Sequence, residues 1–250
     1  GRRLAEACGR QLKRIVLELG GYNPLIVLAD ADLDYAVDAS AFGAFLHQGQ
    51  ICMSARRIVV ERPIAEEFTE RLAAKARDLK AGDPKQPDTI IGPLINEDAL
   101  ATVRGRVEDA VAKGARVLAG GEAVGPCFQA TVLADVPDDA EFARVETFGP
   151  VVAVEVVDSA DEAVARANAT AYGLASGILT ADADRGLQLA QRLEAGIVHV
   201  NDQPVADEPQ MPFGGVKDSG FGRFGGQAAI DEFTELRWIT VTPGPHPFPF

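Results

Sequence analysis

Short apolar runs alternate along most of this chain with segments of helical apolar spacing, and no other feature constrains the fold as much. The runs with strand character are 15–17, 25–28, 57–61, 115–119, 128–134, 151–157, 175–180 and 196–200. The segments with helical spacing are 35–46, 64–79, 96–113, 159–168 and 183–193. Because strands and helices of these lengths alternate, the pattern predicts an α/β fold built on a largely parallel sheet.

The last fifth of the chain departs from this alternation. Residues 201–226 form a long stretch rich in glycine and proline without periodicity, which is typical of a functional loop or a linker. Within it, residues 220–225 match G-x-G-x-x-G. No strand precedes them, so a tight connector is the better interpretation than a dinucleotide-binding loop. Residues 237–241 alternate weakly and predict a terminal strand before a proline-rich end.

Charge and cysteine content exclude several classes of function. The chain carries 24 basic and 37 acidic residues, a net charge of -13, which disfavours binding to nucleic acid. No apolar run is long enough to cross a bilayer, so no membrane partner is expected. Cys8, Cys52 and Cys127 form no CxxC pair, and the three histidines are far apart, so neither a disulfide framework nor a metal site is predicted. Free thiols fit a reducing, cytoplasmic location.

Cys52 is the first candidate for chemistry. It follows Gly49-Gln50-Ile51, and a glycine close to a thiol allows backbone and ligand to approach it. Arg56 and Arg57 follow in the sequence and would favour a thiolate, unless an extended chain points them away. The alternative is that Cys52 is a small buried hydrophobe, as free cysteines usually are.

Glu18 and Glu146 are the other candidates. Glu18 lies in an apolar, strand-like run that ends at a glycine pair, where burial would raise the carboxyl pKa and suit a general base. The alternative is an edge-strand glutamate that points to water. Glu146 precedes Phe148 and a rigid Gly-Pro turn, a combination that could hold a ribose hydroxyl and a flat ring, or be an ordinary loop.

Taken in order, five segments of the chain resemble the aldehyde dehydrogenase superfamily. They are Leu17-Glu18-Leu19-Gly20-Gly21, Gly49-Gln50-Ile51-Cys52, Glu146-Thr147-Phe148-Gly149-Pro150, the stretch 168–174 and the stretch 212–220. From the first segment to the last, they extend over residues 17–220 of the chain. Tyr22-Asn23-Pro24 and His47-Gln48 are most similar to the benzaldehyde, vanillin and salicylaldehyde dehydrogenase branch.

The resemblance implies a division of the chain into four parts. Residues 21–218 would form the catalytic domain, and residues 1–20 would be a remnant of a Rossmann-type cofactor domain. Residues 219–236 would be a connector that returns to the cofactor domain, and 237–250 an oligomerisation tail. It also implies that the chain is an N-terminally truncated fragment, inactive as a dehydrogenase on its own, because the first Rossmann strands and the oxyanion asparagine would lie upstream.

The resemblance also implies the catalytic roles. Cys52 would attack the aldehyde carbon to form a thiohemiacetal, and loss of hydride would leave a thioester. Glu18 would activate the water that releases the carboxylic acid. Ile51 and Met53 would line the substrate pocket, which an aromatic or otherwise hydrophobic aldehyde would fill.

The implied cofactor is NAD or NADP. Leu19 and Gly20 would line the nicotinamide pocket, Glu146 would bind the nicotinamide ribose and Phe148 would contact the ring. The implied assembly is a homodimer or homotetramer. Two alternatives remain open for the chain itself: a non-catalytic oligomerising module, and a cofactor-independent thiol esterase that uses only Cys52 and Glu18.

Overall fold

A seven-stranded sheet forms the centre of the computed structural model, which describes all 250 residues. In order across the sheet, the strands are β11 (Ile197–Val200), β10 (Ala175–Leu179), β2 (Asn23–Val27), β3 (Ala55–Glu61), β8 (Val151–Val157), β7 (Thr131–Ala134) and β4 (Arg116–Ala119). All neighbours pair in parallel except β4, which is antiparallel to β7. The prediction of an α/β fold with a largely parallel sheet is confirmed.

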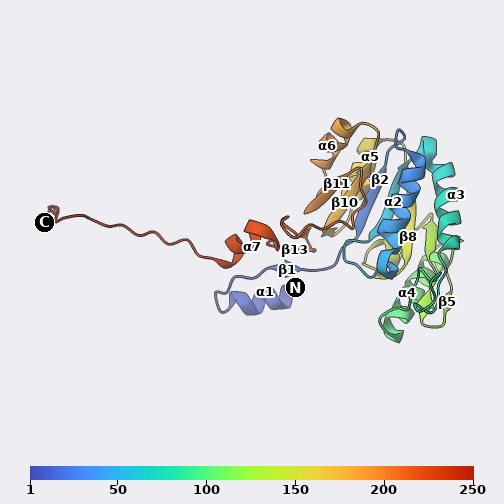
Figure 1. Cartoon of the computed structure of the whole chain (residues 1–250), viewed down its shortest axis with the longest axis horizontal. Helices are drawn as coiled ribbons and strands as arrows, with labels where there is room; N and C mark the ends of the chain where they lie inside the picture. Colours follow the sequence, from blue (N-terminus) through green and yellow to red (C-terminus); the bar gives the residue numbers. More distant parts are fainter.

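Helices cover both faces of this sheet (Figure 1). They are α2 (Leu33–Phe45) and α3 (Arg62–Asp78) on one face, and α4 (Glu97–Ala112), α5 (Ala160–Asn168) and α6 (Ala183–Ala190) on the other. Leu25 and Val27 pack toward α2 and α3, whereas Ile26 packs toward α5 and α6, and all three are inaccessible to solvent. Burial on both faces explains why the central strands are continuous apolar runs. None of the helices combines the length and apolarity needed to cross a bilayer.

Side-chain caps explain where four of these helices begin. The capping residues are Asp32 for α2, Asn96 for α4, Ser159 for α5 and Asp182 for α6. Each accepts a hydrogen bond from a backbone N–H in the first helical turn, which otherwise has no partner within the helix.

Four elements lie together outside the seven-stranded sheet (Figure 1). They are α1 (Arg2–Gly9), β1 (Leu17–Glu18), β13 (Gly220–Phe221) and α7 (Gly226–Phe233). Strands β1 and β13 pair in antiparallel orientation, so two segments far apart in the sequence meet here. The strand expected at 15–17 is thus shifted to 17–18. The G-x-G-x-x-G stretch contributes β13.

Short elements complete the fold. They are β5 (Ala123–Val124) paired with β6 (Cys127–Phe128), β9 (Tyr172–Gly173) paired with β12 (Val216–Lys217), and the 3-10 turns η1 (Leu46–Gly49) and η2 (Glu141–Ala143). The single strand expected over 128–134 is divided between β6 and β7.

The C-terminal segment is extended and exposed. Residues 234–250 contain no helix or strand, and Figure 1 shows them running away from the rest of the molecule. The strand expected at 237–241 is not formed in the single chain, where no other strand lies beside it. Trp238 is 90% exposed and Val241 is 83% exposed, so the apolar side chains of this segment have no partner within the chain.

Candidate functional site

The predicted site residues lie before the amino ends of parallel strands. Gly21 precedes β2, Cys52 precedes β3, and Glu146 and Phe148 precede β8. In most open α/β sheets, ligands bind beyond the carboxyl ends of the strands. In this chain the candidate site lies at the amino ends of the strands, because the turns that enter the strands carry the candidate side chains.

Gly20 and Gly21 allow the first three motifs to touch. The Gly21 N–H donates to Glu146 Oε1 over 3.1 Å. A Cβ atom on Gly21 would overlap the Cys52 carbonyl oxygen and the Asn23 amide, and one on Gly20 would overlap the Glu146 carboxylate. Only glycine permits this approach, which places the Cys52 and Glu146 turns on either side of the glycine pair.

Ser219 connects the C-terminal motif to the same place. Its hydroxyl donates to the Gly20 carbonyl oxygen over 2.7 Å and accepts from the Gly173 N–H over 2.9 Å. Its own carbonyl oxygen accepts from the Leu19 N–H over 3.1 Å. Ser219 is inaccessible to solvent, so these bonds are shielded from water. All five motif segments therefore meet at the amino ends of the sheet strands.

Asn23 fixes the backbone of Cys52, a role that the sequence analysis missed. Its Nδ2 donates to the carbonyl oxygens of Cys52 and Ser54 over 2.7 and 2.9 Å. Its Oδ1 accepts from the Ala175 N–H over 3.0 Å. Asn23 is 1% exposed. The available signal in the sequence was one polar side chain at the start of an otherwise apolar buried strand, which requires internal hydrogen-bond partners.

The half-buried Cys52 borders a small apolar cluster. Met53 and Leu174 form its buried part, with Met53 only 7% exposed, and Ile51 and Cys52 pack against it from the edge. Val205 and Phe213, from the long loop before β12, complete the cluster. Apolar side chains thus pack against the segment that carries the thiol and hold it in place.

The surroundings of Cys52 raise the pKa of its thiol. Burial has the largest effect, and the carboxylates of Glu18 and Glu146 raise the pKa further. The backbone N–H groups of Cys52 and Met53 act in the opposite direction. Since both carboxylates act on the thiol, the structure brings the three predicted reactive groups into one electrostatic environment.

Arg56 and Arg57 do not favour the thiolate. Arg56 points to the carbonyl oxygens of Gly49 and Gly149, and Arg57 lies 3.6 Å from Glu155. Neither contributes to the shift of the Cys52 pKa. The extended conformation of β3 points both guanidinium groups away from the thiol.

Glu18 is half-buried and has a raised pKa. Burial is the main cause, Arg223 lowers the pKa, and Asp207 raises it. Glu18 Oε1 is buried without any hydrogen-bond partner. The side chain does not point freely into water, because its Oε1 is buried. A carboxylate oxygen of this kind is available to accept a proton.

Glu146 and Phe148 share a turn that arginines hold in place. Burial raises the pKa of Glu146, while the Gly21 N–H, Arg56 and Arg106 lower it. Arg106, on α4, also donates to the Glu146 carbonyl oxygen. Phe148 adopts a φ of +52°, which is unfavourable for a bulky residue, and its side chain is 40% exposed. The turn thus presents an aromatic ring to solvent next to a carboxylate.

The other two thiols lie on other elements. Cys8 is half-buried on α1. Cys127 is buried on β6, where its Sγ donates to the Gly82 carbonyl oxygen over 3.4 Å. Burial also raises the pKa of the Cys127 thiol. Neither cysteine belongs to the motif segments around Cys52.

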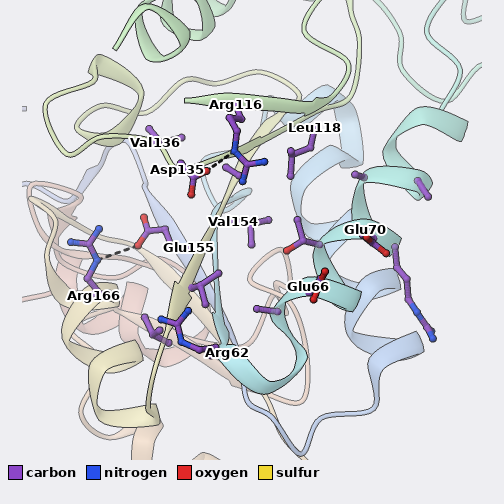
Figure 2. A pocket seen from close by; sticks show the side chains of 18 of the residues that line it. Arg62, Glu66, Glu70, Arg116, Leu118, Asp135, Val136, Val154, Glu155 and Arg166 are labelled. Atoms are coloured by element: carbon purple, nitrogen blue, oxygen red, sulfur yellow. Dashed lines mark hydrogen bonds and ion pairs between the residues drawn. The ribbon is translucent and has the colours of Figure 1, made fainter. Parts of the chain in front are cut away.

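A groove of about 1400 Å³ lies elsewhere, between α3 and the strands β4, β7 and β8. Figure 2 shows its paired charges: Arg116 lies 2.6 Å from Asp135, and Arg166 lies 3.3 Å from Glu155. The groove includes none of the predicted site residues. The predicted reactive groups therefore lie outside this groove, at the amino ends of the sheet strands.

The curated proteins with similar sequences are longer than this chain. It is 49% identical over 251 residues to the benzaldehyde dehydrogenase [NAD(+)] of Pseudomonas putida and 47% identical over 249 residues to the vanillin dehydrogenase of Pseudomonas fluorescens. Each match covers 100% of this chain and 52% of the relative. The chain thus spans about half the length of the curated relatives it matches.

The crystal structure of a salicylaldehyde dehydrogenase from Pseudomonas putida G7, complexed with salicylaldehyde, has a similar fold. It superposes with a TM-score of 0.95 at 45% identity, over 100% of this chain and 52% of that one. The model of the aldehyde dehydrogenase family matches residues 1–239. The chain belongs to the aldehyde dehydrogenase family.

Proposed function

We propose that this chain carries the catalytic residues of an NAD(P)-dependent aldehyde dehydrogenase, with Cys52 as the nucleophile and Glu18 as the general base. One observation carries the proposal: the Cys52 thiol shares its surroundings with two partly buried carboxylates, Glu18 and Glu146. The turns of Cys52 and Glu146 contact Gly21, and Glu18 lies in β1, three residues before it. The similarity to benzaldehyde and vanillin dehydrogenases supports it.

The proposed reaction begins at Cys52. The thiolate sulfur bonds to the aldehyde carbon, and the carbonyl oxygen becomes an oxyanion that the Cys52 backbone N–H can stabilise. Bound NAD(P)+ supplies the acceptor for the hydride that leaves this carbon. The product of that step is a thioester on Cys52.

Glu18 acts in the second half of the reaction. It takes a proton from a water molecule, whose oxygen bonds to the thioester carbon as the C–S bond breaks. The carboxylic acid leaves, and the departing thiolate takes the proton that Glu18 holds, so that thiol and carboxylate are both restored. A general base works best when its pKa approaches the working pH, and burial raises the pKa of Glu18 in that direction. The unpartnered Oε1 is free to accept the proton.

The nicotinamide part of the cofactor would contact four residues. They are Leu19, Gly20, Glu146 and Phe148, which lie on the two turns joined by the Gly21–Glu146 hydrogen bond. Glu146 Oε1 accepts from Gly21, whereas Oε2 has no donor from the protein and fits a ribose hydroxyl. The partly exposed Phe148 ring fits a flat partner. These groups suit the cofactor, whether NAD or NADP.

The four-part division of the chain belongs to the same proposal. Residues 1–20 and 219–236 would lie with the cofactor domain, residues 21–218 would form the catalytic domain, and residues 237–250 would mediate assembly. Two observations support it. The ladder between β1 and β13 joins the first and third parts outside the large sheet, and the fourth part is exposed and apolar.

The substrate that we propose is an aromatic aldehyde. The apolar cluster next to Cys52, to which Ile51 and Met53 belong, suits an apolar ring, and the relatives named above act on aromatic aldehydes according to their names. We also propose a homodimer or homotetramer, because the apolar side chains of the C-terminal segment lack partners within the chain. The three unpaired cysteines support a cytoplasmic location.

Two assays distinguish the proposal from its alternatives. We expect calorimetry to show that this chain binds NAD+ no more tightly than about 1 mM, since it spans only 52% of its NAD(+)-dependent relative. We expect an activated ester to give a burst of leaving group that requires Cys52. Fast turnover of the ester after the burst would favour the thiol esterase, and no burst at all would favour the non-catalytic module.

The dehydrogenase reaction needs a third assay, on this chain joined to the part of the Pseudomonas putida benzaldehyde dehydrogenase that the match leaves uncovered. Benzaldehyde and NAD+ or NADP+ should yield reduced cofactor, detected by absorbance. The Cys52→Ala variant should yield none. Reduced cofactor formed at an equal rate without Cys52 would contradict the proposal.

A further inference from the structure

Arg56 is a buried charge without a carboxylate partner. Its side chain is inaccessible to solvent, it forms no ion pair, and its Nε has no hydrogen-bond partner, so all its hydrogen bonds come from the two terminal nitrogens. Burial lowers its pKa to about 10, so it remains protonated at neutral pH. A buried guanidinium destabilises the folded state unless its N–H groups find good acceptors. The acceptors that Arg56 uses therefore identify what it does.

Both acceptors are backbone carbonyl oxygens at the candidate site. One guanidinium nitrogen donates to the Gly149 carbonyl oxygen over 2.6 Å, and the other donates to the Gly49 carbonyl oxygen. Gly49 belongs to the turn before Cys52, and Gly149 to the turn after Glu146. The two turns also touch directly, since a Cβ atom on Gly49 would overlap the Gly149 carbonyl oxygen.

Neither turn has a relaxed backbone. His47, Gln48 and Gly49 have φ values of +52°, +57° and +63°, three consecutive residues in the left-handed region. Phe148 has a φ of +52° in the other turn. For residues other than glycine, this conformation is strained and persists only where surrounding contacts impose it.

Arg106 accounts for one end of the second turn, through its bond to the Glu146 carbonyl oxygen. Arg56 accounts for the other end at Gly149, and it is the only side chain that bonds to both turns. The planar guanidinium has parallel N–H donors, so it can hold two carbonyl oxygens at a fixed separation.

We propose that Arg56 is a positioning residue that holds the Cys52 turn and the Glu146–Phe148 turn together as one unit. This inference rests on the proposed function for the roles of Cys52 and Glu146, but the coupling of the two turns can be measured without it. Arg56 touches no reacting atom. It acts by keeping the nucleophile and the cofactor-contacting side chains in register.

Arg57 provides a matched control. It is the next residue of β3, is similarly buried, and donates to the carbonyl oxygens of Arg166 and Ala167 instead. It also lies over the Tyr22 ring, at 5.0 Å. Arg57→Met therefore removes a buried guanidinium from the same strand without touching either turn.

The test compares two reactions of the same thiol in a Cys8→Ser background. Acylation by an activated ester needs the carbonyl group to be oriented for oxyanion stabilisation, whereas alkylation by iodoacetamide does not. In Arg56→Met we expect the ratio of acylation rate to alkylation rate to fall about tenfold, the scale expected for a misplaced nucleophile. Arg56→Lys should restore part of the ratio, and Arg57→Met should leave it unchanged.

Hydrogen–deuterium exchange provides the readout that does not depend on function. In Arg56→Met, exchange should rise in peptides covering both 46–50 and 146–150, and Arg57→Met should raise neither. Exchange that rises in only one turn, or an unchanged reaction ratio in Arg56→Met, would overturn the inference. If Arg56→Met does not fold, Arg56→Lys serves instead, and a wild-type ratio and exchange pattern would then overturn it. A wild-type chain that is never acylated at Cys52 would refute the proposed function, and the exchange data would still decide the role of Arg56.

Discussion

The Asn23 side-chain amide donates a hydrogen bond to the Cys52 carbonyl oxygen over 2.7 Å. The same amide group also bonds to the backbone of Ser54 and Ala175, so one buried side chain connects the entries to β2, β3 and β10. The thiol of Cys52 is thereby attached to a rigid part of the sheet, although its own turn contains no regular strand. This contact leads to the first prediction.

Asn23→Ala should lower the free energy of unfolding by about 3 kcal/mol, because it leaves two buried carbonyl oxygens and one buried N–H without partners. Urea denaturation measures the loss. Asn168→Ala is the control: Asn168 also bridges two backbone groups, those of Arg192 and Glu194, but it lies nearer the surface and away from Cys52. An equal loss in both variants would show that Asn23 has no special role at the site.

The second prediction concerns the pH dependence of Cys52 reactivity. Burial and the Glu18 and Glu146 carboxylates raise the thiol pKa, so alkylation by iodoacetamide should reach half its maximum rate above the pH of an ordinary cysteine. Negative neighbours disfavour the thiolate, so Glu146→Gln should move the pH–rate profile to lower pH. Glu155→Gln removes a carboxylate near Arg57 instead and should leave the profile in place. A Glu146→Gln profile displaced to higher pH would contradict the geometry.

The third prediction concerns the stability cost of Glu18. Its pKa is raised in the folded state, so the folded chain is relatively most stable when Glu18 is protonated and loses that stability as the pH rises through the folded-state pKa. Glu18→Gln should therefore raise the free energy of unfolding at neutral pH, by about 0.5–1 kcal/mol for a half-buried group. Denaturation at acidic pH, where Glu18 is protonated, should show little difference between variant and wild type. A variant that is less stable at neutral pH would contradict the prediction.

The fourth prediction concerns assembly. Trp238, Ile239 and Val241 are 90%, 69% and 83% exposed, and unpaired extended segments of this kind recruit other chains. Deleting residues 237–250 should reduce the mass measured by light scattering to that of a monomer. A shorter deletion, of residues 243–250 alone, keeps these three side chains and should leave the mass of the assembly unchanged. A full chain that is already monomeric would contradict the prediction.

The sequence was most informative where burial imposes a pattern. Strand β8 was predicted with its observed ends, and α4 within one residue of each end, because a buried strand must be continuously apolar and an amphipathic helix must be periodic. Helix α7 was missed, since it begins at the second of two glycines and has no buried residue to impose a period. Strands β1 and β13 have two residues each, and they exist only because distant segments pair.

The candidate site shows the same division. Cys52, Glu18 and Glu146 could be selected from the sequence because the motifs that hold them resemble those of aldehyde dehydrogenases; the local context of each residue left an ordinary structural role open. The contacts of Asn23, Arg56 and Ser219 could not, because each connects segments that are far apart in the sequence. Whether Arg56 would face the thiol or the neighbouring carbonyl oxygens depended on which face of β3 it occupied, and that was decided by the packing of the sheet.

The most direct measurement is the mass of the chain during reaction with an activated ester. If Cys52 is the nucleophile and Glu18 the base, intact-mass spectrometry should show one acyl group on the wild type for a short time, and peptide mapping should place it on Cys52. Glu18→Gln should accumulate the same adduct, because loss of the base slows hydrolysis by about 10²–10⁴-fold while leaving acylation intact. Cys52→Ala should show none. An acyl group that persists in Cys52→Ala, or a Glu18→Gln adduct that hydrolyses as fast as the wild type, would contradict the account.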